Sequence, residues 1–357
     1  MKLKKSTRSD LITYGIVIVA FIICLLFNGS FTHKTRALLV PICCYITMAI
    51  SLNLTVGILG ELSLGHAGFM SIGAFSGVIV SASLQNIVTV EWVRLVIAIL
   101  AGAICAAFAG FLIGIPVLRL RGDYLAIVTL AFGEIIKDII TCLIVGVDKN
   151  GIHVIFNVSG TKTINDLGLA QGGKAIIKGA QGVVGNKTIS TYIAGFILIL
   201  VALVIVLNFI HSRSGRAVMA IRDNSIAAES VGIQITRYKM IAFVISAALA
   251  GAAGTLFGLN FSGFDSSKFD FNTSILILVF VVLGGLGNIR GSIIATTILY
   301  ILPEILRDFR DYRMLLYAVI FIFVMLFTNN KTAKSLIDKA VTPFTNLFKT
   351  KKKEGVK

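Results

Sequence analysis

Charged residues are scarce in this sequence. Only 14% of its 357 residues are Asp, Glu, Lys or Arg, whereas about 25% is usual in a soluble domain. The sequence is 56% hydrophobic, and one membrane-spanning helix needs about 20 apolar residues. This composition predicts an all-α polytopic membrane protein and leaves no room for a separate soluble catalytic domain.

Acidic residues are fewer than basic ones, which gives a formal net charge of +16. In a soluble protein, such an excess would suggest nucleic-acid binding. In a membrane protein, it marks the cytoplasmic side and contacts anionic lipid. We therefore expect membrane lipid as a partner and no nucleic acid.

Signatures of metal, disulfide and nucleotide sites are also lacking. The five cysteines form no CxxC pair, so neither a disulfide framework nor a zinc site is indicated. Residues 168–174 match the pattern GxxxxGK, but Ala175 follows in place of the Ser or Thr that would bind Mg²⁺. No catalytic carboxylate pair or nucleophile with a base is evident. We expect no catalytic residues, no bound metal and no cofactor on this chain.

The apolar runs predict about ten membrane-spanning helices. Lys and Arg are concentrated in the segments on the same side as the N-terminus, which predicts that both termini are cytoplasmic. The predicted spans are approximately residues 11–27, 37–56, 66–84, 93–118, 124–145, 190–210, 240–261, 272–286, 291–303 and 314–328.

The predicted organisation follows from these spans. Basic cytoplasmic tails, residues 1–10 and 329–357, flank a transmembrane domain, residues 11–328. The domain includes an outer loop, residues 146–189, that is glycine-rich and long for a connection. A solute-delivering partner that docks on this loop and a flexible insertion are both open. A second long loop, residues 211–239, is polar, basic and cytoplasmic.

The loop 211–239 contains the signals of a short helix. Asp223, Asn224 and Ser225 are all suitable N-caps. Ala227 to Glu229 are good helix formers, and Gly232 suits the left-handed position after a helix. The pattern predicts about two turns with small residues on one side.

A helix with small residues can fit closely into a groove of a soluble partner. Arg213, Arg216 and Arg222 would then pair with an acidic rim. The alternative is a helix that lies on lipid. The alanine-rich face argues against it, because helices on a membrane surface favour large apolar residues.

Two glycine-rich segments, residues 57–68 and 283–291, interrupt the apolar runs. Interrupted segments often border a transport pathway, and their presence in spans 2–5 and 7–10 suggests an inverted repeat. A buried, hydrogen-bonded histidine is the simpler alternative for His66. The expected pathway residues are Glu61, Ser63, Gly65, His66, Gly284, Gly285, Gly287 and Asn288.

Three ionisable residues fall within the fifth span. Glu134 and Lys137 are three positions apart, and Asp138 lies one turn after Glu134. This spacing allows an ion pair within the helix. We favour a structural pair or an interfacial position over a proton relay.

Four stretches resemble the branched-chain amino acid permeases of ABC importers, of the LivM rather than the LivH type. Ala227, Ala228 and Gly232 match the E-A-A-x-x-x-G loop that contacts the ATPase in such permeases, although Ile226 replaces the Glu. The other stretches are residues 52–69, 118–127 and 284–291. Together they cover spans 2 to 9.

The resemblance implies a permease subunit of the bacterial cytoplasmic membrane that forms half of a pathway for branched-chain or other hydrophobic amino acids. The implied partners are a second homologous permease, two ABC ATPase subunits that use ATP and Mg, and an extracytoplasmic solute-binding protein. The residues implied in ATPase coupling are Arg216, Arg222, Asp223, Ala227, Ala228, Glu229 and Gly232.

Other functions stay open. Related permeases import urea and short amides, nucleosides or simple sugars. An ion-coupled secondary transporter would use Glu61, His66, Glu134 and Asp138 as titrating groups. A membrane-embedded enzyme is the third alternative.

Overall fold

The computed structural model describes residues 5–26, 33–120, 122–148, 151–157, 164–169 and 173–306, with positions 315, 318, 319 and 322. The predicted tail 329–357 lies outside the described residues, as does most of the predicted span 314–328. The chain divides into two units, Met1–Thr297 and Ile298–Lys357. All contacts given below lie within the first unit.

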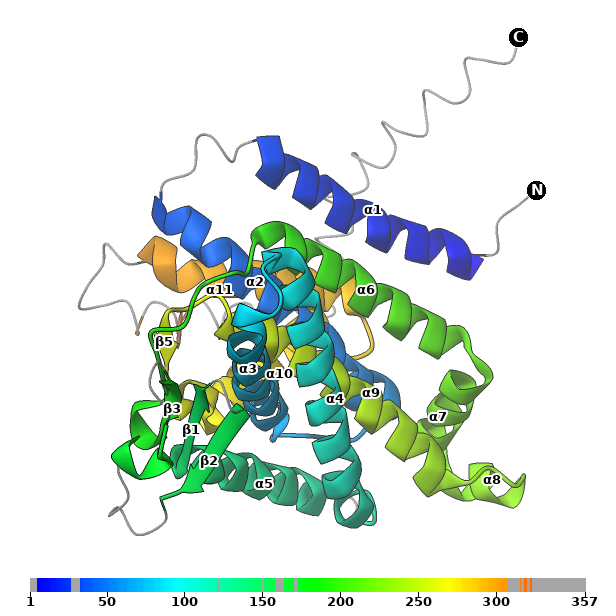
Figure 1. Ribbon diagram of the computed structural model, residues 1–357. Helices are drawn as coiled ribbons and strands as arrows, with labels where there is room; N and C mark the ends of the chain where they lie inside the picture. The colour runs from blue at the N-terminus through cyan, green and yellow to red at the C-terminus, as the bar shows by residue number, and fades with distance from the viewer. Residues whose placement is uncertain are drawn as a thin grey trace. The chain divides into compact units, whose positions relative to one another are not determined.

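The described part of the chain is mostly helical, as its composition predicts (Figure 1). A π-helix, Leu54–Leu59, continues the second α-helix. The α-helices are α1 (Lys5–Leu26), α2 (His33–Asn53), α3 (His66–Ser83), α4 (Glu91–Val117), α5 (Asp123–Thr141), α6 (Tyr192–His211), α7 (Arg213–Asp223), α8 (Ser225–Ser230), α9 (Ile235–Gly258), α10 (Phe271–Gly284) and α11 (Ile289–Ile305).

Six stretches of the described chain are long and apolar enough to cross a membrane, and the stretch Thr13–Leu26 is apolar but shorter. This supports a polytopic helical membrane protein, while the number of ten spans stays a prediction. The six stretches are Arg36–Leu59, His66–Ser83, Glu91–Val117, Tyr192–His211, Ile235–Gly258 and Ser266–Gly284.

Helix α9 packs against α2, α3 and α4 (Figure 1). Glycine lets the backbones of α3 and α9 approach closely. A Cβ added at Gly73 would lie 2.0 Å from the Gly251 carbonyl oxygen, and one at Gly254 would lie 1.9 Å from the Met70 carbonyl oxygen. The two helices are therefore in backbone contact.

Helix α9 also connects two distinct regions of the unit. Its 24 residues span about 36 Å at 1.5 Å per residue. The polar helices α7 and α8 precede its first turn. At its other end, Asn186 Nδ2 donates to the Gly258 carbonyl oxygen at 3.2 Å. The two ends of α9 are thus about one membrane thickness apart. Helices α7 and α8 lie at one end, and the segment 146–189 lies at the other.

A five-stranded antiparallel sheet lies near the C-terminal end of α9. Its strand order is β2-β1-β3-β4-β5. The strands are β1 (Leu143–Asp148), β2 (Gly151–Phe156), β3 (Lys174–Lys178), β4 (Val183–Val184) and β5 (Gly263–Phe264).

The sheet corrects two expectations. The span predicted over residues 124–145 ends as a helix at Thr141, because the apolar run from Leu143 pairs as β1 with β2 and β3. Its β-branched residues suit a strand. The alternative of a flexible insertion for 146–189 is wrong for the part that the structure describes, since β2, β3 and β4 lie there.

Candidate functional site

The polar loop between α6 and α9 folds into two helices. The Oγ of Ser212 accepts a hydrogen bond from the Gly215 amide at 3.0 Å and caps α7. The Oδ1 of Asn224 accepts from the amides of Ile226 and Ala227, both at 3.1 Å, and caps α8. The predicted cap of α8 is confirmed. Helix α7 was not predicted, although Ser212 is a signal of the same kind.

Gly232 occupies the left-handed position just after helix α8, as predicted. The φ of Gly232 is +84°, in the left-handed region. Its amide donates to the Glu229 carbonyl at 2.9 Å, and the Ile233 amide donates to the Ala228 carbonyl at 3.1 Å. These two bonds form a Schellman motif. The loop 211–239 therefore contains a short helix that is closed at both ends.

The exposed face of α8 differs from the predicted face of small residues. Ala228 is only 4% exposed and packs within its own chain. Ile226 is 77% exposed and Val231 is 74% exposed. Ala227 is also exposed. A soluble partner would therefore cover two large apolar side chains and one alanine.

A pocket of about 900 Å³ lies beside α8. Glu229 and Gly232 line it from the end of α8, and the first turns of α9 line it as well. Arg119, which follows α4, forms another part of its wall. The pocket thus lies next to the exposed apolar side chains of Ile226 and Val231.

The two predicted breaks are present. After the π-helix Leu54–Leu59 the backbone turns at Gly60, with a φ of +81°, and stays irregular until α3 begins. Between α10 and α11, Gly285 and Gly287 have φ values of +92° and +77°. Each break thus depends on a backbone conformation that favours glycine.

The structure also brings the two breaks into contact. The Asn53 Oδ1 accepts from the Gly287 amide at 2.8 Å, and the Asn53 Nδ2 donates to the Ser292 Oγ at 2.9 Å. A Cβ at Gly57 would lie 2.2 Å from the Gly287 nitrogen. The breaks, more than 200 residues apart in the chain, form one polar junction.

Two side chains link the α7–α8 region to the first break. Arg222, in the last turn of α7, donates through Nη1 to the Gly57 carbonyl oxygen at 3.1 Å, and its aliphatic chain lies against Gly60. Lys239, in the first turns of α9, forms an ion pair with Glu61. The two side chains of this pair are 10% and 13% exposed. The last turn of α7 and the first turns of α9, which flank α8, are therefore both connected to the first break.

His66 is part of a buried polar cluster. Its Nε2 lies 2.8 Å from the Ser51 Oγ, and Ser51 donates to the Ser246 carbonyl oxygen at 2.6 Å. The alternative of a buried, hydrogen-bonded histidine is thus supported by its surroundings. The His66 Nδ1 and the Ser63 Oγ are buried and have no hydrogen-bond partner among the described residues.

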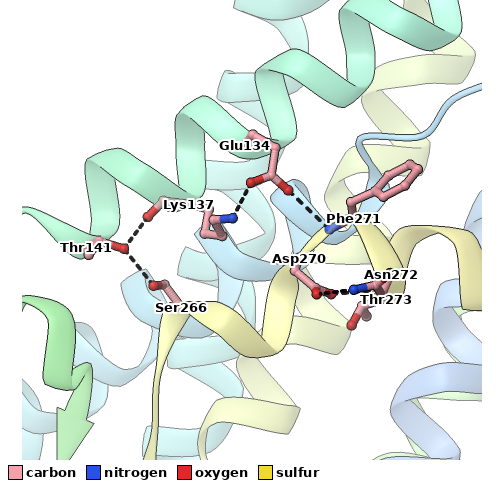
Figure 2. A network of polar contacts seen from close by, with 8 residues as sticks. All are labelled: Glu134, Lys137, Thr141, Ser266, Asp270, Phe271, Asn272 and Thr273. Atoms are coloured by element: carbon pink, nitrogen blue, oxygen red, sulfur yellow. Dashed lines mark hydrogen bonds and ion pairs between the residues drawn. The ribbon is translucent and has the colours of Figure 1, made fainter.

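The ion pair predicted in the fifth span is confirmed. Lys137 donates to Glu134, and the other Glu134 oxygen accepts from the Phe271 amide at 3.2 Å (Figure 2). In the same network, the hydroxyls of Thr141 and Ser266 are hydrogen-bonded at 2.7 Å. These contacts hold α5 against the N-terminal end of α10, which is a structural role.

The remaining predicted residues have local contacts. Arg216 donates to the His211 carbonyl oxygen at 2.8 Å, and Asp223 pairs with Arg222 at 3.0 Å. A Cβ at Gly65 would lie 2.1 Å from the Thr129 carbonyl oxygen, so this glycine allows α5 to approach the break.

Glycines and one asparagine shape the second break. A Cβ at Gly284 would lie 2.3 Å from the Ser292 nitrogen, so α10 and α11 meet at backbone distance. The Asn288 amide donates to the Gly285 carbonyl oxygen at 2.9 Å, which closes the turn between these helices.

Residues 34–326 match the protein family described as the branched-chain amino acid transport system / permease component.

The chain belongs to this permease family.

The family assignment agrees with individual relatives. The high-affinity branched-chain amino acid transport system permease protein LivM of Salmonella typhimurium is 37% identical to this permease over 293 residues, which cover 79% of the chain and 66% of LivM. LivM of Escherichia coli is 36% identical over the same shares. LivH of Salmonella typhimurium is 24% identical over 277 residues, which cover 77% of the chain and 82% of LivH. The chain thus spans about 66% of the length of its LivM relatives. No solved structure matches it.

Family membership and the apolar helices identify this permease as a multi-pass inner-membrane protein. Sequence reasoning missed three polar residues that pair with groups in or beside the two breaks, Asn53, Lys239 and Ser246. Each is a polar or charged residue within or beside an apolar helix, and that position is itself a signal of function.

Proposed function

We propose that this permease is the membrane-spanning subunit of an ATP-driven importer of branched-chain amino acids. The likeness to LivM, across 79% of the chain, supports the substrate class. The weaker likeness to LivH supports a pathway that two homologous permease subunits form together.

One observation carries the coupling role. The capped α7–α8 segment is joined to the first break through Arg222, and through Lys239 and Glu61. The first break is in turn joined to the second through Asn53. A displacement of α8 by a soluble partner would therefore act on both breaks, and a packed junction of this kind changes between discrete arrangements.

The proposed partners follow from the two ends of α9. Two ABC ATPase subunits would use ATP and Mg, and one would cover Ile226, Ala227 and Val231 beside the pocket at α8. A solute-binding protein would deliver the amino acid at the end with the sheet. Membrane lipid surrounds the helices, and no nucleic acid is involved.

The pathway in this proposal passes the junction of the breaks. Ser63 and His66 have buried polar atoms without a partner among the described residues, and such atoms are costly unless something pairs with them. A passing polar solute would meet them. An ion-coupled transporter that uses Glu61 and Glu134 for titration is less well supported, because both carboxylates are held in ion pairs.

The proposed topology has ten spans and both termini in the cytoplasm. It places α8 inside and the sheet outside. An inverted repeat of spans 2–5 and 7–10 is part of the same proposal, and the contact between one break from each half supports it.

Cysteine labelling tests this topology. In a background without the native cysteines, Ile152→Cys on β2 should react with a membrane-impermeant maleimide on intact cells. Val231→Cys after α8 should react only after permeabilisation. Both positions are exposed on the isolated chain, at 51% and 74%. Because the proposed ATPase would cover Val231, the chain is expressed without its partner subunits. Labelling of Val231→Cys on intact cells would contradict the proposed orientation.

Copurification and reconstituted uptake test the function. The tagged chain, extracted in mild detergent, should carry an ABC ATPase and a second permease. The complex in vesicles should take up leucine only with ATP, Mg²⁺ and a binding protein. A particle that contains this chain alone, with uptake that an uncoupler abolishes and ATP does not drive, would contradict the proposal and favour an ion-coupled transporter.

A further inference from the structure

A second pocket, of about 470 Å³, lies between the sheet and the adjoining ends of α3 and α4. Its volume is within the range of small-molecule sites. Arg94, from the first turn of α4, lines it together with Lys174 of β3 and Asp148 of β1. Ser81 and Gln85 contribute neutral polar groups. Neither the coupling segment nor the two breaks take part in this pocket.

Arg94 is the unusual residue of the pocket, which we call the Arg94 pocket. Arg94 is only 3% exposed. Its Nε has no hydrogen-bond partner among the described residues. Glu91, one turn earlier, pairs instead with Lys187 at 2.7 Å. Burial of a charge is costly unless an opposite charge or several hydrogen bonds compensate for it. No carboxylate of the described residues forms an ion pair with this guanidinium, and the pocket beside it has space for an anion.

The charges around the pocket indicate the kind of anion. Lys187 is neutralised by Glu91. Among the described residues that line the pocket, Arg94 and Lys174 then face the single carboxylate of Asp148, which leaves one positive charge over. This balance suits a monoanion better than a phosphate dianion. A planar guanidinium is also the side chain that best matches a carboxylate, through two parallel hydrogen bonds.

We propose that the Arg94 pocket binds a small monocarboxylate of amino-acid size, with Arg94 and Lys174 as the residues that hold the carboxylate. An ammonium group on the ligand contributes little. The Asp148 oxygens are already engaged by the Gly151 amide at 3.0 Å and by His153 at 3.1 Å. The inference does not depend on ATP-driven transport, because the chain alone would bind the ligand.

Two leucine fragments test the proposal on the full-length chain in detergent. 4-Methylpentanoate retains the carboxylate and lacks the amine, whereas 3-methylbutylamine retains the amine and lacks the carboxylate. Binding is measured by isothermal titration calorimetry. The thermal unfolding midpoint gives a second measurement, because a ligand stabilises the state that it binds.

The expected result is a saturable change with 4-methylpentanoate, a similar change with leucine and none with 3-methylbutylamine. Arg94→Gln should weaken 4-methylpentanoate binding about tenfold or more, since it removes a charged hydrogen-bond donor. Arg94→Lys should weaken it less. Lys268→Gln, which removes an exposed lysine outside the pocket, should bind as the wild type does.

Equal responses to the acid and the amine, or no response to either in both measurements, would overturn the proposal. So would wild-type affinity in a folded Arg94→Gln variant. If Arg94→Gln does not fold, Lys174→Gln decides the matter, because this residue is exposed and its replacement should not impair folding. That variant should weaken binding several-fold, and unchanged affinity would count against the site.

Discussion

Lys239→Ala should abolish leucine uptake by the reconstituted complex and lower its thermal stability. The substitution leaves the Glu61 carboxylate without its partner in a site where that side chain is 13% exposed. Removal of one member of a buried ion pair typically costs about 3–5 kcal/mol. The same change removes the ion pair that links the first turns of α9 to the first break. Uptake in vesicles and the unfolding midpoint of the purified complex measure the two effects.

An exchange of the two charges distinguishes loss of the Lys239–Glu61 ion pair from a general loss of folding. In the double variant Glu61→Lys with Lys239→Glu, the pair can form again, and uptake should recover in part. Lys268→Ala removes an exposed lysine that belongs to neither break, and this variant should transport normally. Normal uptake by Lys239→Ala would show that the ion pair does not transmit the movement of α8.

Gly57→Ala should reduce uptake at least tenfold, although it adds only one methyl group. The new Cβ would lie 2.0 Å from the Asn53 Oδ1 and 2.8 Å from the Gly287 Cα. These atoms have little room to move, because Asn53 is itself hydrogen-bonded to Gly287 and Ser292. Overpacking of this kind lowers the stability of the fold by about 1–3 kcal/mol. It would also push the two breaks apart.

Gly15→Ala is the matched control for this prediction. Gly15 lies in α1, and a Cβ there would meet no atom within 4 Å. The control should insert, assemble and transport as the wild type does. If Gly57→Ala assembles and transports at the wild-type rate, contact between the breaks is not required for the transport cycle.

Local patterns in the sequence were reliable where the structure depends on neighbouring residues. The Asn224 cap and Gly232 of α8 are signals that act within one or two turns. The Glu134–Lys137 pair depends only on helical spacing. The breaks at 57–68 and 283–291 depend on glycine and its freedom to adopt positive φ.

The predictions failed where strand pairing or distant packing decided the outcome. Residues 143–145 are apolar enough to continue a helix, but pairing of β1 with β2 and β3 makes them a strand. Ala228 carries the small side chain expected at a partner's groove, yet its own chain covers it. In both cases the competing contact comes from another part of the fold.

The sequence by itself determined that the chain is a helical membrane protein, where its apolar helices are broken, and which loop carries a capped helix, because hydropathy and caps are encoded in short stretches. Only the tertiary structure decided that Asn53 joins the two breaks, that Arg222 and the Lys239–Glu61 pair connect them to α8, and that Arg94 is buried in a pocket. Those contacts join residues up to 239 positions apart, and no local periodicity specifies which polar side chains meet across such a distance.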